Sequence, residues 1–300
     1  MPDSTRAFSE EVVFTDSEDR LALHGLFFRP ASPTASLPVL WIHGIYSEFY
    51  ENAYVALGRE MAGRGYVFLS ANTRGHGFGA ALRSPDGRPF TGGSGWERLE
   101  ESPRDVGAWV DYLAASGFRR VVLGGHGLGA RKAAFYAAER KDARVAGLVA
   151  ASPIVVKPGA GVPLDEERSL LVAARQMVAA GSGRDLLAWP PEGCGMSAAT
   201  RLDHEDPEAP FSNLFDLTGH GRTAPLAAEV TVPILAFFGS LERSPDGRDR
   251  GGELGLLRHN ARSSPQVTIT LIRGADHWYT GKISAVADVI AKFIMSLPSV

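Results

Sequence analysis

Short apolar runs recur along the chain, and each is bounded by glycine, proline or charged residues. Runs of this length, without polar alternation, are typical of strands that are buried on both faces of a parallel sheet. They occupy residues 39–42, 66–71, 120–124, 145–151, 234–238 and 267–272. The pattern therefore predicts a series of central strands.

Near the N-terminus, two β-rich segments at 12–14 and 21–28 flank the turn-forming residues 16–19, which predicts an antiparallel hairpin. Helices are expected between the apolar runs, at about 50–63, 97–116, 128–140, 248–262 and 281–297. In the second of these, four apolar residues at helical spacing would share one face, namely Val106, Trp109, Val110 and Leu113. Strands and helices that alternate in this way predict an α/β fold with an open, doubly wound, mostly parallel sheet.

One long segment, 157–225, interrupts the alternation because it shows no convincing strand. It contains an expected helix at 165–180, followed by a stretch rich in glycine, proline and charged residues. The segment is too long for a simple connection between two strands. We therefore predict one α/β core made of residues 1–156 and 226–300, with 157–225 inserted as a cap or lid. A second irregular loop is expected at 75–95, where glycine is frequent.

The composition is that of an ordinary soluble globular protein, with 44% apolar and 22% charged residues. The net charge of -3 gives no reason to expect a nucleic-acid or membrane partner. The single cysteine, Cys194, excludes an intrachain disulfide and a thiolate metal cluster. No apolar run reaches the roughly 20 residues that cross a bilayer, and the first residues lack the apolar core of a signal peptide. We expect a cytoplasmic protein whose partner is a small-molecule substrate, and the oligomeric state stays open.

The most informative motif is Gly-His-Gly-Leu-Gly at 125–129, between a predicted strand and a predicted helix. One interpretation is a dinucleotide-binding loop, since Gly125, Gly127 and Ala130 fit the G-x-G-x-x-A spacing. Such a loop requires an acidic residue about 20 positions later, at the end of the next strand, but that strand ends in Ala-Ser-Pro at 151–153. The other interpretation is a nucleophile elbow, G-x-S-x-G, with Gly127 in place of the serine.

Four further motifs follow predicted strands. They are His43-Gly44, the Asn-Thr-Arg-Gly-His-Gly run at 72–77, Gly-Ser-Leu-Glu at 239–242 and Gly-Ala-Asp-His at 274–277. Together with the elbow-like motif they resemble the α/β-hydrolase superfamily, of the serine esterase and lipase type, over nearly the whole chain. The order nucleophile, acid, histidine is also that of the superfamily. The resemblance implies the α/β-hydrolase fold, with Glu242 as the triad acid and His277 as the triad histidine.

Gly127 departs from the superfamily at the residue that carries its covalent chemistry. Glycine cannot form an acyl-enzyme, and loss of the nucleophile costs about 10⁶ in kcat in a triad enzyme. No neighbour obviously replaces it, since Ser152 ends a different strand and Cys194 lies in the predicted cap. Glycine nevertheless suits the strained backbone of an elbow. The change is therefore compatible with a new function, with simple loss of function, or with an inactive Ser-to-Gly variant.

The rest of the catalytic machinery is expected to be present. Glu242 would orient His277 as a general acid or base, and Asp246 or Asp249 would be the alternatives to Glu242. Backbone N–H groups alone can form an oxyanion hole, so the glycine leaves it intact. The matching positions are Ile45 and Leu128, and the residues expected to contact the substrate are Tyr46, Trp278 and Tyr279.

We therefore expect an enzyme that acts on a small organic molecule through a His–Glu dyad and an oxyanion hole. Candidate reactions are cyclisation, elimination, isomerisation and water-mediated acyl hydrolysis. The alternatives are a serine carboxylic-ester hydrolase in an inactive form, and a non-catalytic protein that binds a small ligand in the old pocket. No cofactor is expected, and no metal site, because His204 and His220 lack a recognisable ligand spacing.

Overall fold

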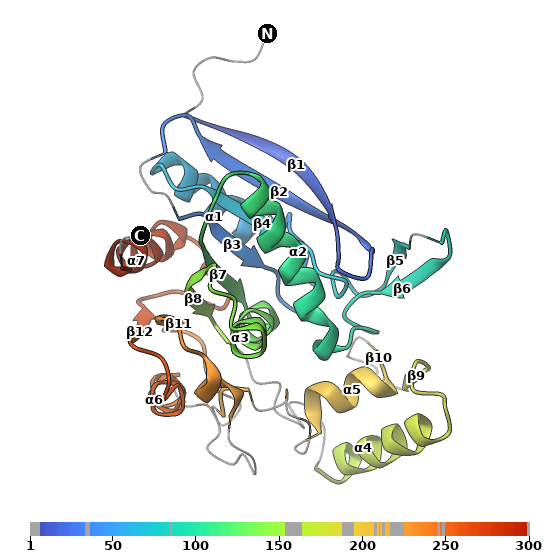
Figure 1. The fold of residues 1–300 in the computed structure, drawn as a ribbon. Helices are drawn as coiled ribbons and strands as arrows, with labels where there is room; N and C mark the ends of the chain where they lie inside the picture. Colours follow the sequence, from blue (N-terminus) through green and yellow to red (C-terminus); the bar gives the residue numbers. More distant parts are fainter. Residues whose placement is uncertain are drawn as a thin grey trace.

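An eight-stranded sheet forms the centre of the molecule (Figure 1). Its spatial order is β1-β2-β4-β3-β7-β8-β11-β12. Neighbouring strands from β4 to β12 are parallel, whereas β2 is antiparallel to both β1 and β4. The strands are β1 (Phe8–Asp16), β2 (Ala22–Pro30), β3 (Val39–Ile42), β4 (Phe68–Ala71), β7 (Val121–His126), β8 (Val145–Ala151), β11 (Ile234–Gly239) and β12 (Val267–Ile272).

The computed structural model describes residues 7–33, 37–84, 86–153, 164–187, 195–206, 209, 211, 214–216, 225–244, 247 and 250–298, with the backbone alone at 164–167.

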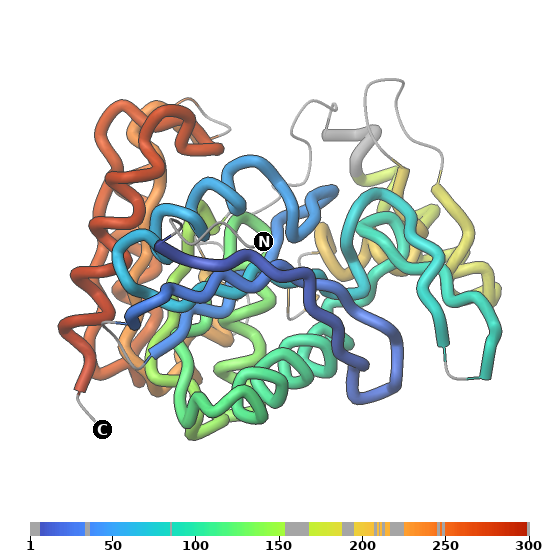
Figure 2. The backbone as a smooth tube through the Cα atoms, turned by 90° about the horizontal axis from the view of Figure 1, so that it is seen from above, coloured from blue at the N-terminus to red at the C-terminus, as the bar shows by residue number. Residues whose placement is uncertain are grey.

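Helices cover both faces of the sheet, as Figures 1 and 2 show. One face carries α1 (Asn52–Gly63) and α7 (Ile283–Ser296), and the other carries α2 (Ser102–Ala115), α3 (Leu128–Arg140) and α6 (Gly251–Asn260). Two short 3₁₀ helices complete these layers, η1 (Leu99–Glu101) and η2 (Leu226–Glu229).

The sheet is apolar on both faces, which explains the uninterrupted apolar runs. Along β3, Val39 belongs to the core between the sheet and α1 and α7, whereas Leu40 belongs to the core on the other side. Val122 and Leu123 of β7 divide in the same way, because successive strand residues point to opposite faces. The structure confirms the predicted α/β fold with an open, mostly parallel sheet.

Some expectations about local structure were wrong. The loop expected to be irregular at 75–95 contains a hairpin of β5 (Ala80–Arg83) and β6 (Pro89–Gly92). The segment 157–225, expected to lack strands, contains β9 (Leu186–Leu187) paired with β10 (Met196–Ser197), followed by α5 (Ala198–Glu205). These strands are too short for an apolar pattern to stand out, and contacts made elsewhere in the fold stabilise them.

The described part of 157–225 packs beside the hairpin β5–β6 and away from α7 (Figure 2). It comprises α4 (Leu164–Ala179), β9, β10 and α5. The Ser197 N–H donates to the Gly95 carbonyl (2.7 Å), and the Trp96 indole N–H donates to the Arg184 carbonyl (3.0 Å). The segment is thus attached to the loop that follows β6. That 157–225 acts as a cap, with the core divided at 156 and 226, stays a prediction.

Arg74, in the Asn-Thr-Arg-Gly-His-Gly run at 72–77, fixes the loop after β4. Its side chain is almost fully buried and forms ion pairs with Asp105 (2.8 Å) and Asp19 (2.7 Å). Asp105 belongs to α2, so this cluster ties the loop after β4 to that helix. An unpaired buried guanidinium would be costly, and the three carboxylates of Asp105, Asp19 and Glu101 compensate this one.

The turn from β7 into α3 is tight because two glycines allow close backbone approach. A Cβ on Gly129 would overlap with the carbonyl oxygens of Ile42 and His43, and a Cβ on Gly125 would overlap with the backbone of Gly129. Gly127 differs from them. Its φ is +56°, which favours glycine, but an added Cβ would meet only the Cα of Gly44, at 3.9 Å. Space is therefore open at the elbow residue itself.

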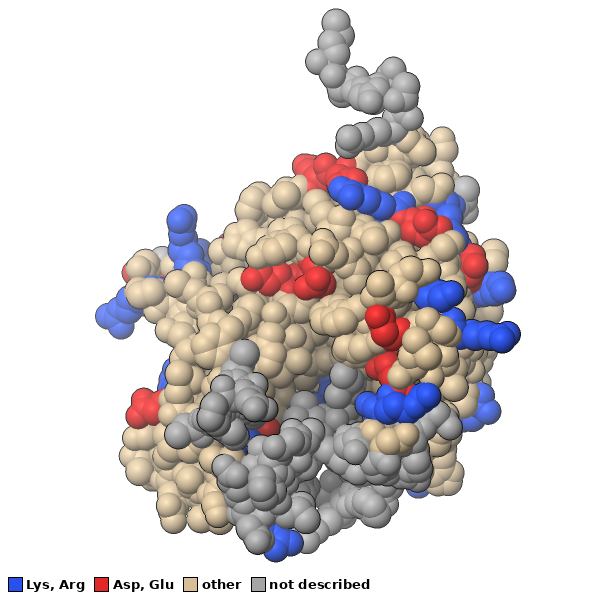
Figure 3. Space-filling view, turned by 180° about the vertical axis from the view of Figure 1, so that it is seen from behind, with Lys and Arg blue, Asp and Glu red and all other residues tan. Residues whose placement is uncertain are grey.

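No helix in the described ranges is long and apolar enough to span a membrane. On the face shown in Figure 3, acidic and basic side chains are interspersed and no extended region of one sign is visible outside the grey atoms. This mixture agrees with the small net charge of the chain.

The close approach at Gly129 leads to a stability prediction. Gly129→Ala should lower the free energy of unfolding by about 3 kcal/mol or more, because the β-carbon overlaps with rigid backbone atoms. Gly255→Ala is the matched control. Gly255 is exposed within α6 and nothing lies near its added Cβ, so this change should stabilise the chain by up to about 1 kcal/mol. Chemical denaturation of both variants tests the difference; equal stability would contradict the tight turn.

Candidate active site

Glu242 and His277 are brought together by two neighbouring parallel strands. Glu242 lies in the turn after β11 and His277 in the turn after β12. The His277 Nδ1 lies 2.9 Å from Glu242 Oε2. A carboxylate accepts, so Nδ1 carries the proton, and Nε2 is left as the proton acceptor of the ring. The side chain of His277 stays 31% exposed.

Glu242 is held from its other oxygen as well. Oε1 accepts hydrogen bonds from the backbone N–H of Gly239 (2.7 Å) and from the Ser152 hydroxyl (2.5 Å). The Ser152 hydroxyl is in turn 2.6 Å from the Tyr279 hydroxyl. Burial alone would raise the pKa of Glu242, but the hydrogen bonds from His277, Ser152 and Gly239 outweigh it and lower the pKa below its ordinary value. Glu242 is therefore an ionised, immobilised partner for His277.

His126 joins the loop of Gly44 to the loop of His277. Its Nε2 lies 2.9 Å from the backbone carbonyl of His277, which can only accept, so the proton is on Nε2. Its Nδ1 accepts from the Tyr54 hydroxyl (3.0 Å), and that oxygen accepts from the Gly44 N–H (3.0 Å). Burial, together with the charge of His277, lowers the pKa of His126 to about 3. The ring is therefore neutral and structural.

His43 also has a structural place. Its Nδ1 donates to the Gly44 carbonyl (2.8 Å) and its Nε2 accepts from the Thr73 N–H (3.1 Å). Burial and the nearby Lys132 lower its pKa well below the ordinary value, so the imidazole is neutral. These bonds connect the loop after β3 with the loop after β4.

Ile45 and Leu128, the residues predicted to supply the oxyanion N–H groups, both line the cavity at the elbow. Leu128 is the first residue of α3, so its N–H has no partner within the helix. Neither this N–H nor that of Ile45 donates a hydrogen bond within the described part of the chain. The N-terminal end of α3 also carries the positive end of the helix dipole. Both groups are therefore available to a developing negative charge.

A cavity of about 80 Å³ lies above the elbow. It is lined by Gly44, Ile45, His126, Gly127, Leu128, Arg131, His277 and Trp278. Trp278 thus lies where a substrate contact was expected. Tyr46 and Tyr279 are described but do not line this cavity, and Tyr279 is buried behind Glu242. Substrate contacts for these two residues stay predictions.

Several considered residues cannot be placed. Asp246, Asp249, Cys194 and His220 lie outside the described residues. His204 is buried in α5. Within the described ranges, no three histidine, cysteine or acidic side chains come together as metal ligands.

Two features of the site were missed at the sequence level. Ser152 was considered only as a replacement nucleophile, whereas it supports Glu242. The signal is absent from the sequence because Ser152 reaches Glu242 through a left-handed backbone conformation, with φ of +42°. Arg131 was not considered at all. Its position four residues after Gly127, one helical turn into α3, could have indicated it.

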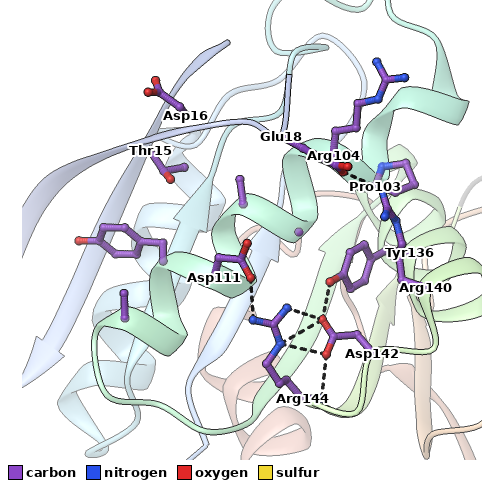
Figure 4. Close-up of a pocket in the computed structure, with 14 residues that line it drawn as sticks. Thr15, Asp16, Glu18, Pro103, Arg104, Asp111, Tyr136, Arg140, Asp142 and Arg144 are labelled. Atoms are coloured by element: carbon purple, nitrogen blue, oxygen red, sulfur yellow. Dashed lines mark hydrogen bonds and ion pairs between the residues drawn. The ribbon is translucent and has the colours of Figure 1, made fainter. Parts of the chain in front are cut away.

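A larger hollow of about 700 Å³ lies between the β1–β2 turn, α2 and α3 (Figure 4). Charged groups in it pair with one another. Arg144 forms ion pairs with Asp111 (2.6 Å) and Asp142 (2.7 Å), and the Tyr136 hydroxyl donates to Asp142 (2.6 Å). These groups are therefore mutually satisfied, in contrast to the open Nε2 of His277.

Comparisons with known proteins agree with this architecture. No curated protein matches the chain. Among solved structures, hypothetical protein PA2218 from Pseudomonas aeruginosa is 16% identical, covers 98% of this chain and 95% of its own, and has a TM-score of 0.63. Est1E from Butyrivibrio proteoclasticus, solved with ferulic acid, is 18% identical (94% and 98% covered, TM-score 0.62). The Pyrococcus furiosus esterase Pf2001 is 17% identical (95% and 93% covered, TM-score 0.56).

At these identities the solved structures show a common fold. The family assignment comes from a model described as "Alpha/beta hydrolase family", which matches residues 39–289. That range runs from β3 through the first half of α7 and includes the elbow, Glu242 and His277. The chain therefore belongs to the alpha/beta hydrolase family.

Proposed function

We propose that this chain is an enzyme that acts on a small organic molecule by non-covalent acid–base chemistry. The observation that carries the proposal is a His277–Glu242 pair with its hydrogen bonds complete, beside a cavity whose elbow residue has no side chain. In a protein without catalytic activity, the His277–Glu242 pair would have no need of the hydrogen bonds that fix both carboxylate oxygens of Glu242. The esterases among the similar structures agree with acyl chemistry.

The geometry favours acyl hydrolysis by a water molecule. The space over Gly127, where a serine Oγ would stand, is open to a water or to part of the substrate. His277 Nε2 would accept a proton as the water oxygen attacks the carbonyl, and Glu242 would stabilise the imidazolium. The N–H groups of Ile45 and Leu128 would stabilise the oxyanion. The proton would then pass from His277 to the leaving group.

The same groups would serve cyclisation, elimination or isomerisation. In each of these reactions His277 moves one proton, and the N–H groups stabilise an enolate or alkoxide. What all four reactions share is the absence of a covalent intermediate on residue 127.

The dyad is tested by substitution. His277→Ala should lower kcat/KM for p-nitrophenyl acetate by about 10² or more, because it removes the only proton acceptor proposed for the reaction. Glu242→Gln should also lower kcat while leaving KM nearly unchanged. The control is His259→Ala, which changes an exposed histidine on α6 and should have no effect. Unchanged turnover in His277→Ala would remove the dyad from the mechanism.

A second test restores the missing side chain. Gly127→Ser should place a hydroxyl within reach of His277, at a backbone cost of about 1–2 kcal/mol for a left-handed φ. The variant should show a burst with p-nitrophenyl acetate and become labelled by a fluorophosphonate probe that the wild type ignores.

Gly127→Ala is the matched control for this experiment. It adds the same β-carbon and the same backbone strain without a nucleophile, so it should stay unlabelled. A folded Gly127→Ser protein that is inert to both reagents would contradict a working dyad and oxyanion hole, and would favour a ligand-binding protein. If Gly127→Ser gains esterase activity and wild-type Gly127 has no turnover, an inactive form of a serine esterase is the better explanation.

A further inference from the structure

Arg131 lies at the edge of the active-site cavity, on the same helix turn that begins at Gly127. The residue is only 2% exposed, and its Nη2 donates to the backbone carbonyl of Phe211. Its Nη1 is buried and has no hydrogen-bond partner among the described residues. Buried donors are nearly always satisfied, because an unsatisfied one loses its hydration without compensation. We therefore expect Nη1 of Arg131 to donate a hydrogen bond to a bound ligand.

The two described acids whose charges act on Arg131, Glu97 and Asp203, are already paired with other cations. Glu97 Oε2 lies 2.5 Å from Lys132 Nζ, and Asp203 Oδ2 lies 2.6 Å from Arg98 Nε. Within the described part of the chain, Arg131 itself has no ion pair. Among the described residues, these two acids thus face three cations, namely Lys132, Arg98 and Arg131, and the unmatched positive charge is that of Arg131.

Burial lowers the pKa of Arg131 to about 10, and the carboxylates of Glu97 and Asp203 offset only part of that effect. The guanidinium therefore remains charged at pH 7. His204, on α5, adds no further positive charge, because burial and the charges of Arg131 and Lys132 lower the pKa of His204 to about 3. A buried cation in this state is stabilised when an anion enters beside it.

We propose that the active-site cavity takes a substrate that carries a carboxylate, and that Arg131 binds this carboxylate. The inference rests on the proposed function, since it names the substrate class of the same cavity. The unpartnered Nη1 would donate a charge-assisted hydrogen bond to the carboxylate. The N-terminal end of α3, with Leu128 in the cavity wall, adds positive potential on the same side.

The charge count favours a monoanion. One unmatched positive charge is neutralised by one carboxylate, whereas a phosphate group would bring about two negative charges and leave a buried excess. The cavity, of about 80 Å³, also suits a small ligand.

The test is a binding measurement that does not depend on turnover. Protein-observed NMR titration would compare acetate, butyrate and benzoate with acetamide, butyramide and benzamide, for wild type and Arg131→Gln. We expect the carboxylates to bind wild type at least 10-fold more tightly than their amides. Arg131→Gln should weaken carboxylate binding by about 10- to 100-fold and leave amide binding unchanged.

Two further variants serve as controls. Arg140→Gln changes an exposed arginine on the same helix, which pairs with Glu18 on the surface, and should bind like wild type. Arg131→Lys keeps the charge and should keep the preference for carboxylate over amide. If Arg131→Gln does not fold, this lysine variant carries the test, and loss of its preference would overturn the proposal.

Other outcomes also decide the question. Equal affinity of wild type for acids and amides, or carboxylate binding unchanged in a folded Arg131→Gln, overturns the anion site. Tighter binding of methyl phosphate than of the carboxylates overturns the assignment to a monoanion. His277→Ala is titrated in parallel. If His277→Ala keeps both carboxylate binding and turnover, the proposed function fails while the anion site stands. If His277→Ala loses turnover but Arg131→Gln binds carboxylates as tightly as wild type, the anion site alone fails.

Discussion

The site depends on the tight turn from β7 into α3. Gly125 and Gly129 let the turn and the start of the helix pack directly against backbone atoms, with no room for a β-carbon. This packing fixes the direction in which α3 leaves the sheet. As a result the Leu128 N–H and Arg131 both reach the cavity, and His126 comes to lie under it. A helix that started a few ångströms further from the sheet would lose these placements together.

Neutral histidines link the loops around this turn. His126 connects the Gly44 N–H, through Tyr54, to the backbone of His277. Its low pKa matters because its ring centre lies 4.4 Å from that of His277. A second imidazolium at this distance would oppose protonation of His277. Burial thus keeps His126 neutral, and the ring adds no charge beside His277.

The fold and the central pair could be predicted from the sequence because they depend on local and topological signals. Apolar runs mark buried strands, and the motifs at 239–242 and 274–277, which follow such strands, resemble those of the α/β-hydrolase superfamily, which is why Glu242 and His277 were expected to meet. The support from Ser152 and Tyr279 could not be predicted, since both reach their positions through left-handed backbone that no motif signals. The hairpin β5–β6 was missed for a different reason: its paired strands have only four residues each, too few for an apolar pattern to stand out.

The absence of a side chain at residue 127 and the unmatched charge at Arg131 have one consequence in common. A serine side chain would occupy part of the space over the elbow, which lies beside a cavity of about 80 Å³. On the proposed function, its absence would leave room for a small carboxylate and a reacting water between Arg131 and His277. The carboxylate would neutralise Arg131, so the oxyanion would be stabilised mainly by the N–H groups of the elbow and by the end of α3. On the proposed function, the glycine at residue 127 would change which molecules fit as well as how they react, and both effects would require the fixed His277–Glu242 pair.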